Sequence, residues 1–201
     1  MLSHTSRALL FLGLAAAAAA VAAVTLPVGA TPPGKNGKLV FERGKFPATD
    51  IFTVDADGSG LTRLTRLRGL ERDPTWSPDG SKLAFVRGRN PYRGPYDIWA
   101  VNADGSGLER LTRHRQFSIG SALAWSPDGG KIVYAADAGG PDHLGLYVMN
   151  SDGSGKRRLS ISRSRDYTDP TWSPDGNSIT VADGGFGRDF DSRIAVVDAF
   201  G

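Results

Sequence analysis

The sequence predicts an all-β chain assembled from repeated four-stranded units, and two recurring motifs support this prediction. Trp-Ser-Pro-Asp-Gly begins at Trp76, Trp125 and Trp172, with spacings of 49 and 47 residues. An Asp or Asn followed by x-Asp-Gly-Ser-Gly begins at Asp55, Asn102 and Asn150, with spacings of 47 and 48 residues. Because two independent motifs keep the same period, the chain is a repeat protein.

The second repeat shows the first half of the unit most clearly. Residues 74–76 are short and end in Trp, which predicts strand a. The next residues, Ser77–Gly80, have Pro at the second turn position and Gly at the fourth, as a type I turn prefers. Residues 82–86, apolar after Lys82, predict strand b, and residues 87–96 contain Gly and Pro and predict a loop.

The second half of the unit is a hairpin. Residues 97–101 alternate in the manner of strand c, Asp104-Gly105 marks a tight turn, and residues 108–112 predict strand d. Four antiparallel strands in a period of 40 to 50 residues are typical of one blade of a β-propeller. Nothing after the N-terminal segment shows helical periodicity.

The first and last units are incomplete. The first begins at residues 38–41 with strand b, and the last ends at residues 194–197 with strand c. Residues 38–201 therefore predict about three and a half blades, a partial or truncated propeller. The chain is then a fragment, an early-terminated product, a small four-bladed ring with thin edge blades, or a half that needs a partner. Uncovered strand edges favour self-association through the incomplete blades.

The N-terminal segment predicts export. Residues 8–26 are uninterrupted apolar or small residues, Pro27 follows, and Val28–Ala30 offers a small-x-Ala cleavage site. We interpret residues 1–30 as a signal peptide and residues 31–37 as a linker, which predicts a secreted or periplasmic protein. The alternative is an uncleaved anchor, because the apolar run reaches the lower limit of a transmembrane helix. Membrane contact is expected only through such an anchor.

The composition excludes several classes of protein. The chain has no Cys, which excludes a disulfide framework, a thiolate metal site and a lipid-modified N-terminal Cys. A net charge of +3 on 201 residues is too small to argue for nucleic acid, so no nucleic-acid partner is predicted.

The repeated motifs have structural interpretations that compete with functional ones. The three motif Trp residues share one repeat position, so we expect them to fill space between blades rather than to stack on a ligand. The x-Asp-Gly-Ser-Gly turns resemble the first half of a calcium loop, but that loop needs Glu at its twelfth position. Arg66, Arg113 and Ile161 stand there instead. The sequence therefore predicts hairpin turns and no metal site.

No catalytic arrangement is recognisable, so we predict no enzyme activity and no cofactor. The two His residues beyond the leader, His114 and His143, lie in predicted loops, and no Gly-x-Ser-x-Gly motif is present. Asp73 and Asp169 precede Pro at matching positions, with Ser121 as the expected counterpart in the repeat between them. We interpret these carboxylates as turn or backbone caps rather than as an acid–base pair.

Strand alternation and charge together predict a binding face. The a–b and c–d turns must lie at one end of the blades, and the b–c and d–a loops at the other. The tight turns carry Asp, whereas the d–a loops are rich in Arg. Loops on a rigid scaffold are common binding sites, and Arg suits carboxylate or phosphate. We therefore predict an acidic protein partner bound by Arg68, Arg72, Arg115 and Arg165, the alternative being that these side chains are merely solvated.

The repeats also resemble a known family. Pro-x-Trp-Ser-Pro-Asp-Gly-x-x-Leu-Ala-Phe, followed by Asp-Ile-x-x-Val-Asn-Ala-Asp-Gly-Ser-Gly, is similar to the Trp-Asp-like repeat of TolB-type β-propellers, and related blades occur in prolyl oligopeptidases. The resemblance covers residues 38–201 and implies an extracytoplasmic propeller that binds protein partners. TolB propellers have six blades, more than this chain supplies. The alternative function is a propeller fragment of an exported prolyl oligopeptidase-like hydrolase that lacks its catalytic domain.

Overall fold

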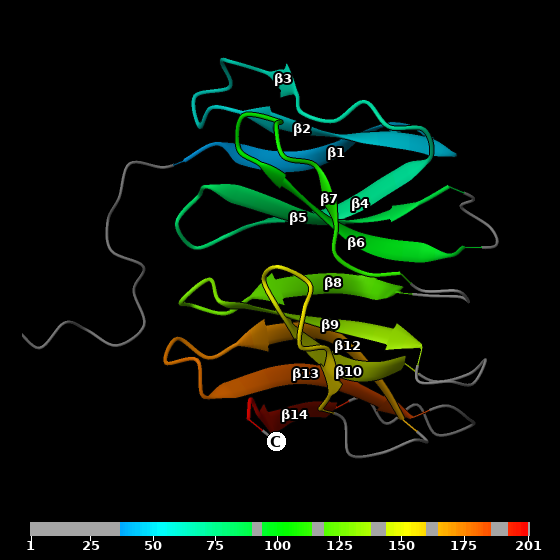
Figure 1. Cartoon of the computed structure of the whole chain (residues 1–201), viewed down its shortest axis with the longest axis vertical. Helices are drawn as coiled ribbons and strands as arrows, with labels where there is room; N and C mark the ends of the chain where they lie inside the picture. Colours follow the sequence, from blue (N-terminus) through cyan, green and yellow to red (C-terminus); the bar gives the residue numbers. More distant parts are fainter. Residues whose placement is uncertain are drawn as a thin grey trace, which may run out of the picture. The chain divides into compact units, whose positions relative to one another are not determined.

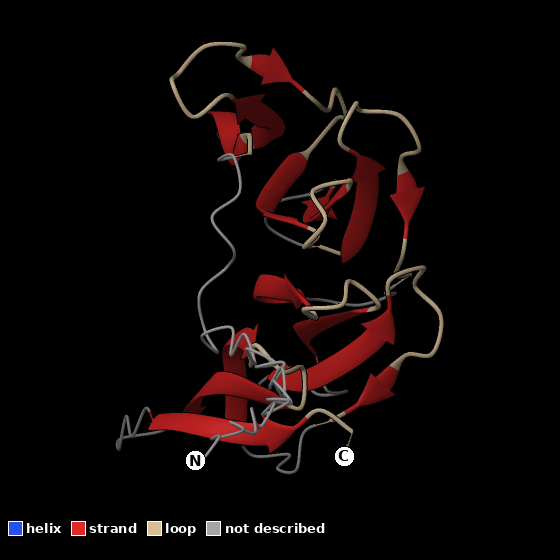
Figure 2. Ribbon diagram, turned by 90° about the vertical axis from the view of Figure 1, so that its left-hand side faces the viewer, coloured by secondary structure: helices blue, strands red, loops and turns tan. Residues whose placement is uncertain are grey.

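The computed structural model describes residues 37–89, 94–113, 119–137, 144–159, 165–185 and 193–200. The chain divides into two compact units, Met1–Ala30 and Thr31–Gly201, and every described residue belongs to the second. Regular secondary structure in the described part consists of strands (Figure 2). Among these residues, no helix has the length and apolar character that a membrane crossing requires.

The described strands form four antiparallel sheets that follow one another in chain order (Figure 1). The first sheet contains β1 (Leu39–Lys45), β2 (Ala48–Val54) and β3 (Thr62–Arg63). The second contains β4 (Leu70–Trp76), β5 (Lys82–Gly88), β6 (Tyr96–Asn102) and β7 (Glu109–Arg110). The third contains β8 (Ile119–Trp125), β9 (Lys131–Asp137), β10 (Leu144–Asn150) and β11 (Arg157–Arg158). The fourth contains β12 (Arg165–Trp172), β13 (Ser178–Gly185) and β14 (Arg193–Asp198).

This arrangement confirms the predicted all-β partial propeller. Sheets of three, four, four and three strands are found among the described residues, as the incomplete first and last repeats predicted. The first sheet lacks a described strand a and the fourth a described strand d. Strand a is longer than expected and strand d shorter, since β4 begins at Leu70 and β7 contains only two residues.

The Trp-Ser-Pro-Asp-Gly motif makes the a–b turn of each later sheet. In the second sheet the Gly80 amide donates to the Ser77 carbonyl at 2.9 Å. The Asp79 carboxylate accepts from the Ser77 hydroxyl at 2.6 Å and from the Ser81 amide at 3.0 Å. Gly80 has a φ of 69°, which Gly adopts without the strain that a Cβ brings. The turns at residues 126–130 and 173–177 repeat these backbone bonds, and all three lie at the left in Figure 1.

A β-bulge recurs at one position of each strand a. Register shifts occur within β4, β8 and β12, and the residue at the shift has positive φ: Asp73 at 53°, Ala122 at 71° and Asp169 at 50°. The counterpart of Asp73 in the third sheet is therefore Ala122, and the expected match with Ser121 was wrong by one residue. Because Ala can occupy the position, the bulge does not depend on a carboxylate.

The apolar core lies between successive sheets. One cluster joins Val86 and Ile98 of the second sheet to Trp125 and Tyr134 of the third. Corresponding clusters join the first sheet to the second and the third to the fourth. Trp125 is 8% exposed and Trp172 9%, which confirms that these motif Trp residues fill space between blades.

Candidate functional site

The predicted basic face lies only partly within the described residues. The Arg68 side chain is exposed. The backbone carbonyl of Arg68 accepts a hydrogen bond from Arg87 Nη2 at 3.0 Å. The Arg72 guanidinium lies 4.8 Å from the centre of the Tyr96 ring, with its Nε 3.6 Å from Asp73 Oδ2. Arg115 and the Arg165 side chain lie outside the described residues, as do His114 and His143. A joint surface of the four predicted Arg residues stays a prediction.

A basic cleft is present on the second sheet that the sequence reasoning missed. It has a volume of about 410 Å³ and is lined by Arg87, Arg89, Pro95, Asp97, Trp99 and Arg110. Strand pairing brings these residues together, because Arg87 of β5 lies opposite Asp97 of β6 and Trp99 of β6 lies opposite Arg110 of β7. We call this set of six lining residues the arginine cleft.

Two of the three guanidinium groups in the arginine cleft are held in place. The Arg87 guanidinium lies 5.0 Å from the centre of the Trp99 ring. Arg110 Nη2 is 2.5 Å from Asp97 Oδ2, and Arg110 Nε donates to the Thr112 carbonyl at 2.9 Å. Burial, together with the neighbouring charges of Arg89 and Arg110, lowers the pKa of Arg87. Arg89 is exposed, so the cleft combines fixed cations with an accessible one.

Part of this arrangement is a repeated structural device. In the first sheet Arg63 Nη2 is 2.6 Å from Asp50 Oδ2, and Arg63 Nε donates to the Thr65 carbonyl at 3.1 Å, as Arg110 does to Thr112. Equivalent contacts of Arg63 and Arg110 therefore join strands c and d in two successive blades. The arginine cleft differs in adding Arg87 and Arg89 beside Trp99. No alternation marks the end of strand b, because Leu83–Val86 is a continuous apolar run, so the sequence carried no signal that the strand continues through Arg87.

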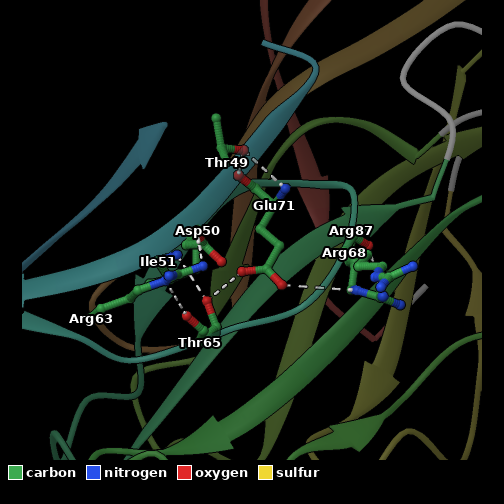
Figure 3. A network of polar contacts seen from close by, with 8 residues as sticks. All are labelled: Thr49, Asp50, Ile51, Arg63, Thr65, Arg68, Glu71 and Arg87. Carbon is green, nitrogen blue, oxygen red and sulfur yellow. Dashed lines mark hydrogen bonds and ion pairs between the residues drawn. The ribbon is translucent and has the colours of Figure 1, made fainter. Parts of the chain in front are cut away.

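A buried carboxylate lies beside the arginine cleft, at the joint between the first two sheets (Figure 3). Glu71 of β4 has 0% exposure, and the Thr65 hydroxyl donates to its Oε2. Arg87 Nε is 3.8 Å from Glu71 Oε1, and neither atom has a hydrogen-bond partner within the part of the chain that the structure describes. Burial raises the pKa of Glu71 to about 7, and the nearby Asp50 acts in the same direction. Glu71 thus links Arg87 to the first sheet.

The Asp residues of the tight turns are engaged by their own loops. The Asp57 and Asp104 carboxylates each accept from the amide and the hydroxyl of the Ser two residues later, which lowers their pKa values. These bonds support the hairpin interpretation of the motif. Within the described ranges, no group of three or more His, Cys, Asp or Glu residues is placed to hold a metal ion.

The chain is similar to known proteins both in sequence and in fold. No protein-family model matches the chain. A TolB homologue from Chlorobium luteolum is 32% identical over 153 residues, which is 76% of this chain and 33% of the relative. The solved structure of TolB from Acinetobacter baumannii superposes with a TM-score of 0.63 at 21% identity, covering 80% of this chain and 40% of that one. The chain is a TolB-like β-propeller.

Other relatives and solved structures are also similar to this TolB-like propeller. A Tol-Pal system protein TolB from Anaeromyxobacter dehalogenans is 32% identical over 61% of this chain and 26% of its own length. A peptidase from Bacillus subtilis, YuxL, is 33% identical over 60% of the chain and 18% of its own length. Puromycin hydrolase has a TM-score of 0.63 at 19% identity, over 82% of this chain and 28% of that one. The TolB-like propeller thus spans a third or less of the curated relatives' length.

Proposed function

We propose that the chain is an extracytoplasmic, non-enzymatic binding module that holds an acidic segment of a protein partner. The observation that carries this proposal is the arginine cleft, which Arg87, Arg89 and Arg110 line together with Trp99. The similarity to a TolB named as a Tol-Pal system protein also supports a protein partner. Arg68 lies next to the cleft through its bond to Arg87, so we extend the binding surface to Arg68 and to the other loop residues Arg72, Arg115 and Arg165.

The geometry favours carboxylate as the bound group. A guanidinium presents paired N–H donors that match a carboxylate, and groups already fixed by the fold lose little freedom on binding. Arg87 and Arg110 are fixed by Trp99 and Asp97, and the exposed Arg89 is available to close on the ligand. Exposed charge pairs are worth about 0.2 to 1 kcal/mol each, so affinity comes from several together.

A charge-matched pair of variants tests the proposal. The double variant Arg68→Ser, Arg89→Ser removes two exposed cations at the cleft, and Lys82→Ser, Lys156→Ser removes two exposed cations near the tight turns. With a ten-residue polyglutamate peptide as probe, the first variant should bind about 2- to 30-fold more weakly, and the second should bind as the parent does. Isothermal titration calorimetry at 50 and 150 mM salt measures both. Equal losses in the two variants would mean that net charge, and not the cleft, binds the peptide.

The wider surface has a test of its own. Replacing Arg68, Arg72, Arg115 and Arg165 together by Ser should weaken binding by about tenfold to several hundredfold, with a smaller effect at high salt. Because Arg72 also packs on Tyr96, the unfolding curve of this variant must be measured beside its affinity.

Export is the second part of the proposal. We infer that residues 1–30 direct the chain out of the cytoplasm and that the mature protein begins at Thr31. N-terminal sequencing of the exported protein should return Thr-Pro-Pro-Gly. A sequence that begins at Met1 would show an uncleaved anchor instead.

The peptidase relative and the puromycin hydrolase structure favour one alternative function, the propeller of an exported hydrolase. The reading frame around the coding sequence distinguishes the two. Further blades alone support the binding module, whereas a following α/β segment with a Gly-x-Ser-x-Gly motif supports the hydrolase.

A further inference from the structure

Each later joint between sheets contains the same indole hydrogen bond. Trp125 of the third sheet donates from Nε1 to the Thr75 carbonyl of the second at 3.3 Å. Trp172 of the fourth sheet donates from Nε1 to the Ala124 carbonyl of the third at 3.2 Å. In both cases the acceptor is the residue before the motif Trp in the preceding strand a. In the third sheet the motif Trp125 thus donates to the sheet before it, and Ala124 beside it accepts from the sheet after it.

The a–b turns make a second contact that repeats in the same direction. Pro78 Cδ lies 3.7 Å from the point where a Cβ on Gly129 would stand, and Pro127 Cδ lies 3.7 Å from the corresponding point on Gly176. Each turn Pro thus lies beside the turn Gly of the next sheet.

The first joint lacks both contacts. Among the described residues, the buried Trp76 Nε1 has no hydrogen-bond partner, and none of them lies within 4 Å of the Cβ point on Gly80. The groove at this joint has a volume of about 710 Å³, against about 450 Å³ and 170 Å³ at the next two. Gly37, Lys38 and Leu39 line it in place of an a–b turn. β1 also lies at the edge of its sheet among the described strands.

We propose that this groove binds one extended segment of a partner polypeptide, which adds to β1 as a strand a. The register specifies the fit. Leu39 of β1 lies opposite Val54, and Leu83 of β5 lies opposite Val101, so Leu39 and Leu83 are equivalent positions. The next residue of β1, Val40, is then equivalent to Ala84, which lies opposite Thr75 of strand a. The segment residue opposite Val40 therefore presents its carbonyl to Trp76 Nε1. A turn after the segment, with Pro at its second position, covers Gly80.

The contacts favour another polypeptide over a second copy of this chain. β4, β8 and β12 are each already paired with the next strand, so a second copy would have to unfold a sheet to release one. Strand addition to an open edge uses main-chain hydrogen bonds for affinity and alternate side chains for specificity. Glu42 of β1 is exposed, and its negative charge disfavours an acidic residue in a strand that pairs with β1.

The chain's own repeat provides the probe. A synthetic peptide with the sequence of residues 119–130 contains a strand a, the motif Trp and the turn, without a charged residue in its strand. The protein is labelled with ¹⁵N and the peptide is not, so the spectrum shows indole N–H signals of the protein's four Trp residues alone. Adding the peptide should move the Trp76 signal downfield, because that N–H gains an acceptor, and leave the Trp125 and Trp172 signals in place.

Matched variants identify the contact. Trp76→Phe should weaken peptide binding by about 2- to 10-fold through the lost hydrogen bond, and the signal that disappears in this variant is that of Trp76. Trp125→Phe should leave the affinity for the peptide unchanged. A peptide with Gly at the turn Pro should also bind more weakly, which provides a test that needs no change in the protein. The double variant Arg68→Ser, Arg89→Ser should bind the parent peptide with unchanged affinity. The test of the groove therefore gives a result that does not depend on whether the arginine cleft binds its acidic probe.

Two results would overturn the inference. One is a Trp76 signal that does not move at millimolar peptide. The other is a Trp76 signal that moves with protein concentration in the absence of peptide, together with dimerisation in sedimentation, which would assign the groove to a second copy.

Discussion

Glu71 should make the stability of the chain depend on pH in the direction opposite to most carboxylates. Its carboxyl group has 0% exposure, and burial raises its pKa from 4.5 to about 7. The folded chain therefore binds this proton more tightly than the unfolded chain does. The stabilisation is fully present below pH 4.5 and is lost as the pH rises through about 7.

The magnitude follows from the two pKa values. At 1.36 kcal/mol for each pH unit, the interval from 4.5 to about 7 corresponds to about 3 kcal/mol. Arg87 opposes the change, but its Nε is 3.8 Å from the Glu71 carboxylate and makes no hydrogen bond to it. Glu71→Gln keeps the shape of the protonated side chain and cannot ionise, so its unfolding free energy should lack this contribution.

Urea unfolding at pH 5, 6, 7 and 8 measures the effect. The stability of Glu71→Gln relative to the parent should increase by up to about 3 kcal/mol from pH 5 to pH 8, with the steepest change between pH 5 and pH 7 and a plateau above pH 7. Glu109→Gln is the matched control, because Glu109 is exposed on β7. A difference between Glu71→Gln and the parent that stays constant across this range would refute the reasoning.

Three further predictions concern the repeats. Trp125→Phe and Trp172→Phe should each lower the unfolding free energy by about 1 kcal/mol through the lost indole hydrogen bond, whereas Trp76→Phe should not, because the Trp76 N–H has no partner among the described residues; chemical denaturation compares the three variants. Asp79→Ala should lower the melting temperature at pH 7, and the difference should vanish as the pH falls through about 2, because hydrogen bonds from Ser77 and Ser81 lower the pKa of Asp79 to about 2; calorimetry between pH 7 and 2 checks this. Gly153→Ala should lower the unfolding free energy by about 1 to 3 kcal/mol more than Gly58→Ala. Both glycines have positive φ, but only a Cβ at residue 153 would meet another residue, 2.7 Å from the Leu111 carbonyl oxygen. Equal losses in the two variants would show that φ alone decides.

Sequence repetition predicted the strands and their order because each motif makes a local turn. Ser77, Pro78 and Gly80 close the turn with bonds between near neighbours, and nothing outside the repeat is needed. The positive φ of Ala122 is different. Neither Ala nor its neighbours indicate a bulge, although Ala122 stands three residues before its motif Trp as Asp73 does, so the sequence gives the equivalence of the positions but not their conformation.

The arginine cleft was harder to predict because it depends on which residues lie opposite one another. Arg87 was assigned to a loop, although β5 continues to Gly88. Once the strand is extended, Arg87 lies opposite Asp97, and Trp99 lies opposite Arg110. The orphan N–H of Trp76 depends on three-dimensional contact alone, since the sequence around it matches that around Trp125 and Trp172.

The indole hydrogen bonds also give the repeat array a direction. Each motif Trp finds its acceptor in the sheet that precedes it in the chain. As the polypeptide is synthesised from its N-terminus, the acceptor for each new Trp has therefore already been made. A blade duplicated onto the C-terminal side would inherit a ready acceptor, whereas one inserted ahead of β1 would have to bring the carbonyl for Trp76 with it. Such an array can grow in evolution at its trailing end without leaving a new donor unsatisfied.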